Sequence, residues 1–162
     1  MNNIIEKINN LKQEEVLEAI LACRTLVGDT KWNYGGEIET FLNSLEENPN
    51  HSLQKVEEIS KIALVIASQD DQFKEQINSI IDTVGNKAFV FGATEILMAA
   101  ALGVLVIHTL KTGGKKSEKR KISIEKTDDG KQKICIEENI SYGVSNGISN
   151  LITSILKTIK SG

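Results

Sequence analysis

Two cysteines are the residues of this 162-residue chain best suited to nucleophilic or redox chemistry. Cys23 and Cys135 match no spacing typical of a metal or redox site, and two thiols do not make a disulfide framework. Cys23 shares a helical face with Val16, Ile20 and Val27, which is typical of a buried thiol that packs like a small apolar residue. Neither cysteine therefore predicts a catalytic nucleophile.

The two histidines lie in unrelated contexts. His51 falls in the turn Asn48–Ser52, and His108 falls at the end of an apolar helix, where an imidazole commonly satisfies terminal carbonyl groups. No serine stands in a recognisable nucleophile motif. We therefore predict a protein that is not an enzyme and that uses no metal and no cofactor.

The segment Thr112–Lys119, TGGKKSEK, has the glycines and lysines of a phosphate-binding loop but not its spacing. It also leaves a predicted helix instead of entering one, so its amide groups would not point at a phosphate. A linker with Gly113 as the C-terminal cap is the better interpretation.

The charge of the chain is unevenly distributed. Residues 111–133 hold nine Lys/Arg and four Asp/Glu, a net +5, so a total of −3 leaves −8 for the remainder. Such a basic segment suits an anionic partner or the acidic surface of the protein itself. We do not expect nucleic acid as a partner, because no aromatic residue is interleaved for stacking on bases. The lysines that we consider for contacts are Lys115, Lys116, Lys119 and Lys121.

The first half of the chain predicts several short helices. Apolar residues recur at helical spacing in five stretches, separated by Gly28-Asp29, the aromatic loop around Trp32, the turn Asn48–Ser52 and Asp70-Asp71. We expect an N-terminal multi-helix bundle over residues 1–85.

The second half predicts strands beside helices. Lys119–Lys126 and Lys131–Glu137 alternate polar and apolar residues around an Asp-Gly turn, which is a strong hairpin signal. KAFVF at Lys87–Phe91 reads as a further strand, and an amphipathic helix is expected from Val144 to Ile159. The whole predicts an α+β, mainly helical fold: the bundle, followed at 87–162 by a β-α-β-β-α unit with one hairpin.

The apolar run from Ala88 to Leu110 is long enough to cross a membrane, and lysines follow it directly. Glu95 argues against a span, because a carboxylate in lipid costs about 2.5–3.5 kcal/mol. We favour a core helix that Thr94 caps, with Glu95 in the first turn, where the helix dipole stabilises a carboxylate. The alternative is a membrane-inserting effector in the inner membrane.

A core helix from Thr94 to Leu110 would be apolar nearly all round and would need cover on both sides. We expect the hairpin to cover one face, and the N-terminal bundle or another copy of the protein to cover the other. The candidate contact residues on this helix are Gly92, Glu95, Ala99 and Gly103, of which Ala99 and Gly103 have the spacing that lets helices approach closely.

The order of features from Gly92 to Glu137 resembles a known group of proteins. A Gly/Ala-rich apolar helix ends in KTGGKKSEKRK, and KISIEKTDDGKQKICIEE follows as strand, turn and strand. This order resembles the small effector-associated accessory components of bacterial NTP-dependent conflict and immune systems, and the helical first half is similar to their adaptor domains. The resemblance implies a non-enzymatic adaptor in bacterial defence.

The expected function is therefore protein–protein interaction, with a homo-oligomer or a larger effector protein as the partner. The polar N-terminus MNNIIEKINN lacks the apolar core of a signal peptide, so we expect the protein in the cytosol.

Overall fold

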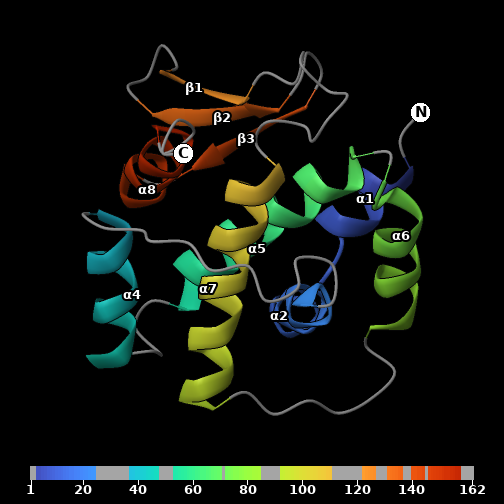
Figure 1. The fold of residues 1–162 in the computed structure, drawn as a ribbon. Coiled ribbons are helices and arrows are strands. Elements are labelled where there is room, and N and C mark those ends of the chain that lie inside the picture. The colour runs from blue at the N-terminus through green and yellow to red at the C-terminus, as the bar shows by residue number, and fades with distance from the viewer. Residues whose placement is uncertain are drawn as a thin grey trace.

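The computed structural model confirms a mainly helical α+β fold (Figure 1). It describes residues 3–24, 37–47, 53–70, 72–84, 92–110, 122–126, 131–136, 140–144 and 146–157. Within these ranges the chain forms seven helices and one three-stranded sheet. Figure 1 shows the sheet as a separate layer above the helices.

Five helices of the first half follow the apolar repeats of the sequence, as predicted. They are α1 (Asn3–Asn9), α2 (Gln13–Ala22), α4 (Glu37–Glu47), α5 (Leu53–Ser68) and α6 (Lys74–Thr83). Lys7 of α1 joins α6, because its Nζ lies 2.9 Å from Oδ1 of Asp82 and donates to Oδ1 of Asn78 across 3.3 Å. Because both bonds are exposed to solvent, they contribute little to the stability of the fold.

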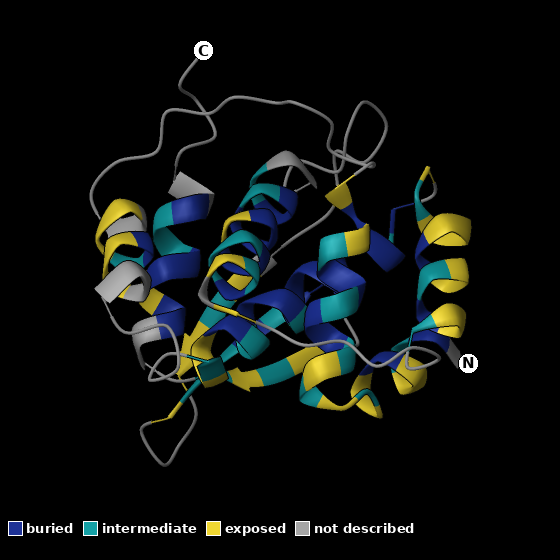
Figure 2. Ribbon diagram, turned by 90° about the horizontal axis from the view of Figure 1, so that it is seen from below, coloured by how far each residue is buried: buried dark blue, intermediate teal, exposed yellow. Residues whose placement is uncertain are grey.

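Helix α5 is the centre of the molecule. It contacts α1, α2, α6, α7 (Ala93–Leu110) and α8 (Asn146–Lys157). All residues from Ile62 to Ser68 are buried, so this half of α5 is enclosed on every side. Figure 2 shows that buried residues face inward from the surrounding helices and that exposed residues lie on their outer sides.

Helix α7 lies in front of α5 in Figure 1, and the contact between these two helices is the most extensive in the molecule. Helices α2, α4 and α8 cover further parts of α7. The expected cover by the N-terminal helices is therefore present, whereas the described strands of the hairpin contact α8 more than they contact α7. Buried residues from both halves of the chain form one core.

The sheet contains the predicted hairpin and a third strand that the sequence did not suggest. Its strands β1 (Ile122–Lys126), β2 (Gln132–Ile136) and β3 (Ile140–Val144) are antiparallel in the order β1-β2-β3. In the register of the sheet, Ile136 pairs with Ile122 on one side and with Ile140 on the other. The strand predicted at 87–91 lies outside the described residues.

Helix α8 closes the inner face of the sheet. Ile148, Leu151, Ile152 and Ile155 are buried along one side of it, and the hydroxyl of the buried Ser149 donates to Oε1 of Gln132 on β2. The helix begins at Asn146, so Val144, predicted as its first apolar residue, belongs to β3 instead.

Candidate interaction surface

The inward face of α7 carries the small residues. Ala99 and Gly103 are buried, and a Cβ atom built on Gly103 would lie 3.4 Å from Cγ2 and 3.5 Å from the carbonyl oxygen of Ile59. Absence of a side chain at Gly103 thus allows α7 to approach the backbone of α5 closely. Gly103 therefore packs against the chain's own α5, and Ala99 is buried one turn before it, so neither of these two predicted contact residues is open to a partner in this structure.

The other two predicted residues on this helix lie at its N-terminal end. The backbone N–H of Gly92 donates to Oε1 of Glu95 across 2.8 Å, and the N–H of Ile96 donates to the carbonyl oxygen of Gly92 across 3.1 Å. Gly92 therefore occupies the capping position that the sequence assigned to Thr94, while Glu95 lies in the first turn as predicted. The N–H of Lys12 donates to Oε1 of Glu15 in the same way across 2.8 Å at the start of α2. The carboxylate of Glu95 thus serves the helix itself.

The outward face of α7 is partly open to solvent and carries no Lys, Arg, Asp or Glu. Thr94 and Ala101 are exposed, and the other members of the face are partly exposed. Successive residues turn by about 100° around a helix, which places all six within one sector of about 100° opposite Gly103. We call this the outward stripe; its members are Thr94, Leu97, Met98, Ala101, Leu105 and His108.

A surface helix normally turns charged or polar side chains to water. Helix α7 has no charged residue between Glu95 and His108. The missing charges make the outward stripe unusual for a helix face that solvent reaches, and apolar side chains that remain partly exposed are a common feature of interaction sites. Sequence reasoning missed these residues because the inward face is equally apolar, and nothing local distinguishes the two faces.

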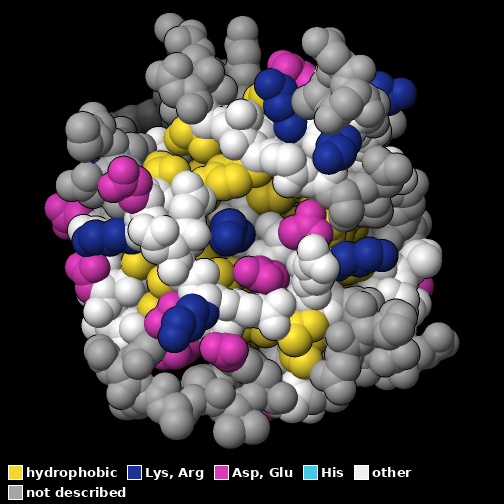
Figure 3. Space-filling model, turned by 180° about the vertical axis from the view of Figure 1, so that it is seen from behind, with side chains coloured by type: hydrophobic (Ala, Val, Ile, Leu, Met, Phe, Trp, Pro, Cys, Tyr) yellow, Lys and Arg dark blue, Asp and Glu magenta, His cyan; other side chains and the backbone are white. Residues whose placement is uncertain are grey.

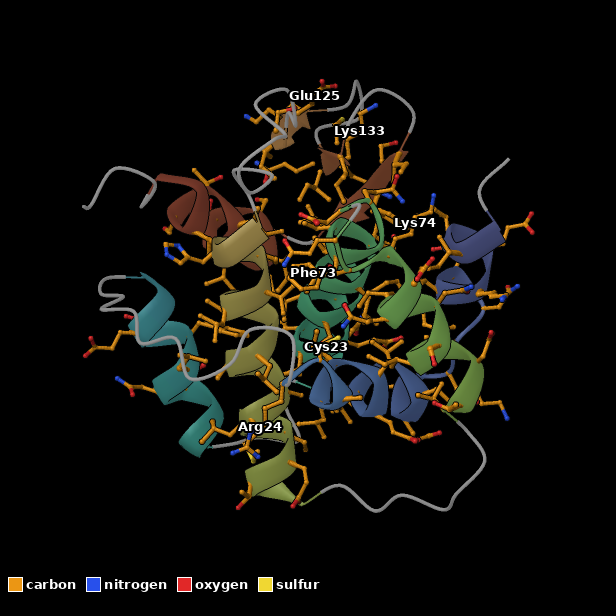
Figure 4. All side chains as sticks on the ribbon, turned by 45° about the vertical axis from the view of Figure 1, so that its right-hand side comes forward. Cys23, Arg24, Phe73, Lys74, Glu125 and Lys133 are labelled. Atoms are coloured by element: carbon orange, nitrogen blue, oxygen red, sulfur yellow. The ribbon has the colours of Figure 1, made fainter. Side chains whose placement is uncertain are left out.

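The outer face of the sheet presents small and polar side chains. Ser123, Cys135 and Ser141 lie opposite one another across the three strands. Nζ of Lys133 lies 3.9 Å from Oε1 of Glu125, and Figure 4 shows this pair at the end of the molecule formed by the sheet. Burial raises the pKa of the Cys135 thiol, and the carboxylate of Glu125 raises it further. The thiol is therefore protonated near neutral pH and is a weak nucleophile.

The second thiol, that of Cys23, is less reactive. Cys23 is fully buried, and burial raises its pKa to about 12.

Within the described ranges, no group of three or more His, Cys, Asp or Glu side chains could hold a metal ion. His51 lies outside the described residues, as do Lys115, Lys116, Lys119 and Lys121.

Charged side chains of both signs are interspersed on the face opposite α7. Figure 3 shows Lys/Arg and Asp/Glu side chains alternating there around apolar ones, without a field of one sign among the coloured residues. Such mixing is typical of an ordinary solvated surface and not of a phosphate-binding one.

Comparison of this chain with protein families, with curated proteins and with solved structures finds no match. Among the helices that the structure describes, none combines the length and the apolar character needed to cross a membrane.

Proposed function

We propose that this protein is a non-enzymatic interaction module that binds another protein through the outward stripe of α7. The supporting observation is an uncharged helix face, partly open to solvent, on a helix whose other sides are buried. Both thiols have raised pKa values, so they are protonated and weakly nucleophilic near neutral pH. A part in bacterial defence, and a place in the cytosol, rest on the sequence resemblance and the N-terminal composition alone.

The stripe suits a helical or flat apolar partner surface. Ala101 stands at its middle as an exposed methyl group, flanked by the partly exposed side chains of Met98 and Leu105. A small residue between two large ones forms a groove between ridges, and side chains of another helix can pack into such a groove. Methionine adapts its shape to such a partner because its side chain is unbranched and flexible.

Site-specific photo-crosslinking in living cells tests this function. A photoreactive amino acid replaces Ala101, and the same amino acid replaces the exposed Glu39 on α4 as a matched control. We expect protein adducts of defined mass from position 101 and none, or only diffuse ones, from position 39. Equal labelling at both positions, or no protein adduct at position 101, would contradict the proposal.

The membrane-inserting alternative predicts a different result in the same experiment. Its insertion would place position 101 among lipid tails, so lipid adducts would replace protein adducts. It further predicts that the purified protein floats with anionic liposomes and that Leu102→Asp abolishes flotation. Flotation of the folded protein together with lipid adducts at position 101 would overturn the interaction module.

A further inference from the structure

We infer that the free edge of β1 pairs with the β1 edge of a second copy of this chain, so that the two three-stranded sheets join into one continuous sheet. The two β1 strands run antiparallel around a two-fold axis at Ser123. This edge is separate from the outward stripe of α7, so the inference does not depend on the proposed function. Three observations support it: the edge is open, its residues are complementary to themselves, and its charges match.

The edge of β1 is open to solvent. In the order β1-β2-β3, β1 pairs with β2 on one side only, and Figure 1 shows β1 as the strand farthest from α1 and α5. Ser123, Glu125 and Lys126 are exposed, and Ile124 is partly exposed. The outer edge of such a strand presents backbone N–H and C=O groups in series, and another extended strand is the partner that can bind all of them.

The described length of β1 lacks two features by which edge strands commonly prevent pairing. Its residues include no proline, and their register with β2 continues unbroken from Ile122 to Lys126, so the strand has no bulge. Charge is confined to its last two residues, Glu125 and Lys126, which leaves Ile122–Ile124 uncharged. These three residues are therefore able to pair with another strand.

The residues Ile122–Ile124 match themselves in an antiparallel pair. With the axis at Ser123, the two serines lie opposite each other, and Ile122 of each copy lies opposite Ile124 of the other. Residues opposite each other share one face of the sheet, so isoleucine meets isoleucine and serine meets serine. Ile124 packs against the core yet stays partly exposed, and the second copy would cover its exposed part. A surface complementary to itself under a two-fold rotation is the requirement for a symmetric dimer.

The charges on both sides of these three residues match as well. Lys121 directly precedes them in the sequence, and Glu125 directly follows them. The same register therefore brings Lys121 of each copy towards the exposed Glu125 of the other, which gives one pair of opposite charges at each end. Within its own chain the Glu125 carboxylate lies 3.9 Å from Nζ of Lys133, at the limit of an ion pair, so it can accept a second cation.

Other two-fold registers fit less well. An axis at Ile124 would place Lys126 opposite Ile122, and an axis at Glu125 would place two glutamates opposite each other. With the axis at Ser123, the next pair outward is Lys126 with Arg120, two cations, so the paired segment ends at Glu125. Pairing over residues 121–125 makes a small interface, and we therefore expect a dimer that dissociates on dilution in the micromolar range.

Light scattering on the purified full chain tests the second copy. From about 5 to 500 μM we expect the mass to rise from the 17.8 kDa of one chain towards twice that value. Ser123→Arg places two cations opposite each other at the axis and should weaken association at least about tenfold. Ser141→Arg is the matched control, because Ser141 is an exposed serine in the same row of the sheet but on β3, and it should associate like the wild type.

Circular dichroism establishes that both variants are folded. A wild type that stays monomeric throughout overturns the inference, as does a folded Ser123→Arg protein that associates like the wild type. Association that Ala101→Arg weakens and Ser123→Arg does not would assign the contact to the outward stripe and would also overturn it. The proposed function fails separately, if position 101 captures no protein in cells.

Exchange of charges tests the register. Glu125→Lys places lysine opposite lysine in a pair of like copies, and Lys121→Glu places glutamate opposite glutamate, so each variant alone should associate at least about tenfold more weakly than the wild type. A mixture of the two variants restores opposite charges at both ends and should form mixed dimers about as tightly as the wild type. A mixture that associates no better than either variant alone overturns the antiparallel pairing at Ser123.

Discussion

The carboxylate of Glu95 folds back over the first turn of α7 and accepts a hydrogen bond from the backbone N–H of Gly92, with 2.8 Å between Oε1 and N. The first N–H groups of a helix have no partner within the helix, so this bond satisfies one donor that would otherwise lack one. A Cβ on Gly92 would lie only 3.0 Å from the same oxygen, so glycine leaves room for the returning side chain.

Removing this carboxylate should destabilise the fold. We expect Glu95→Ala to lower the free energy of unfolding by about 1 kcal/mol, because the acceptor and the favourable charge near the helix N-terminus are both lost. Glu95→Gln keeps an acceptor and should lose about half as much. Urea unfolding followed by circular dichroism measures both changes. Glu39→Ala on α4 is the control, since an exposed surface side chain should contribute less than about 0.5 kcal/mol; equal losses at both sites would contradict the capping role.

The two faces of α7 should respond differently to added volume. Gly103→Leu forces a side chain against the backbone of Ile59 and should lower the free energy of unfolding by about 2–3 kcal/mol. Gly103→Ala should change it by less than about 1 kcal/mol, because the gain in helix propensity offsets a tight contact. Ala101→Leu, which points to solvent, should leave stability within about 0.5 kcal/mol of the wild type. If leucine at position 103 and leucine at position 101 had similar effects on stability, the conclusion that the Gly103 face of α7 packs against α5 would be wrong.

Replacing each of two buried serines of α5 by alanine should change the free energy of unfolding in opposite directions. The hydroxyl of Ser60 has no hydrogen-bond partner among the described residues, whereas Ser68 donates to the carbonyl oxygen of Val65 across 2.7 Å and accepts from Nε2 of Gln69 across 3.1 Å. Ser60→Ala should therefore raise the free energy of unfolding by about 1 kcal/mol, and Ser68→Ala should lower it by about 1 kcal/mol. Thermal unfolding of the two variants and the wild type measures both changes. A loss of stability in Ser60→Ala would contradict the prediction and would indicate that the Ser60 hydroxyl makes a hydrogen bond within the core.

Alkaline pH should destabilise the fold through Cys23. Burial raises the pKa of this thiol from 9.0 to about 12, so the unfolded chain releases the proton first as the pH rises. Well below pH 9.0 the thiol is protonated in both states and its contribution is constant. Above that value the free energy of unfolding should fall by up to about 1.4 kcal/mol per pH unit, until the folded thiol also ionises near pH 12.

A comparison of variants isolates this effect from the ionisation of lysines and tyrosines. Cys23→Ala should be less stable near neutral pH because it leaves a cavity, yet its stability should fall less steeply above pH 9.0. Cys135→Ala should keep the steep fall, since it retains Cys23. Chemical unfolding between pH 7.5 and 10.5 gives the three slopes, and parallel curves for the wild type and Cys23→Ala would exclude the buried thiol as the cause.

Local patterns were sufficient to predict most of the helices and the hairpin. The recurrence of Val56, Ile59 and Ile62, for example, has helical spacing, and the alternation around Ile124 and Ile134 has strand spacing. Periodicity could not predict β3, because its five residues include Gly143, which weakens a strand pattern, and its last residue, Val144, also fits the apolar repeat of α8.

The candidate surface was harder to predict than the elements that carry it. Gly103 and Ala101 both belong to an apolar run, and the sequence favoured the face with Ala99 and Gly103 as the contact face. Packing against Ile59, a residue 44 positions earlier in the chain than Gly103, decides which face turns inward. A contact of this kind depends on the tertiary arrangement and leaves no local signal.

The enclosure of α5 has a consequence for synthesis on the ribosome. Ile62–Ser68 leave the ribosome 42 residues before the end of α7 and 89 residues before the end of α8, whose atoms complete their burial. At about 5–20 residues per second, a strongly apolar segment waits unshielded for roughly 2 to 18 s. We therefore expect the nascent chain to bind holding chaperones during that interval, and we expect the yield of folded protein to depend on the rate of translation through the second half.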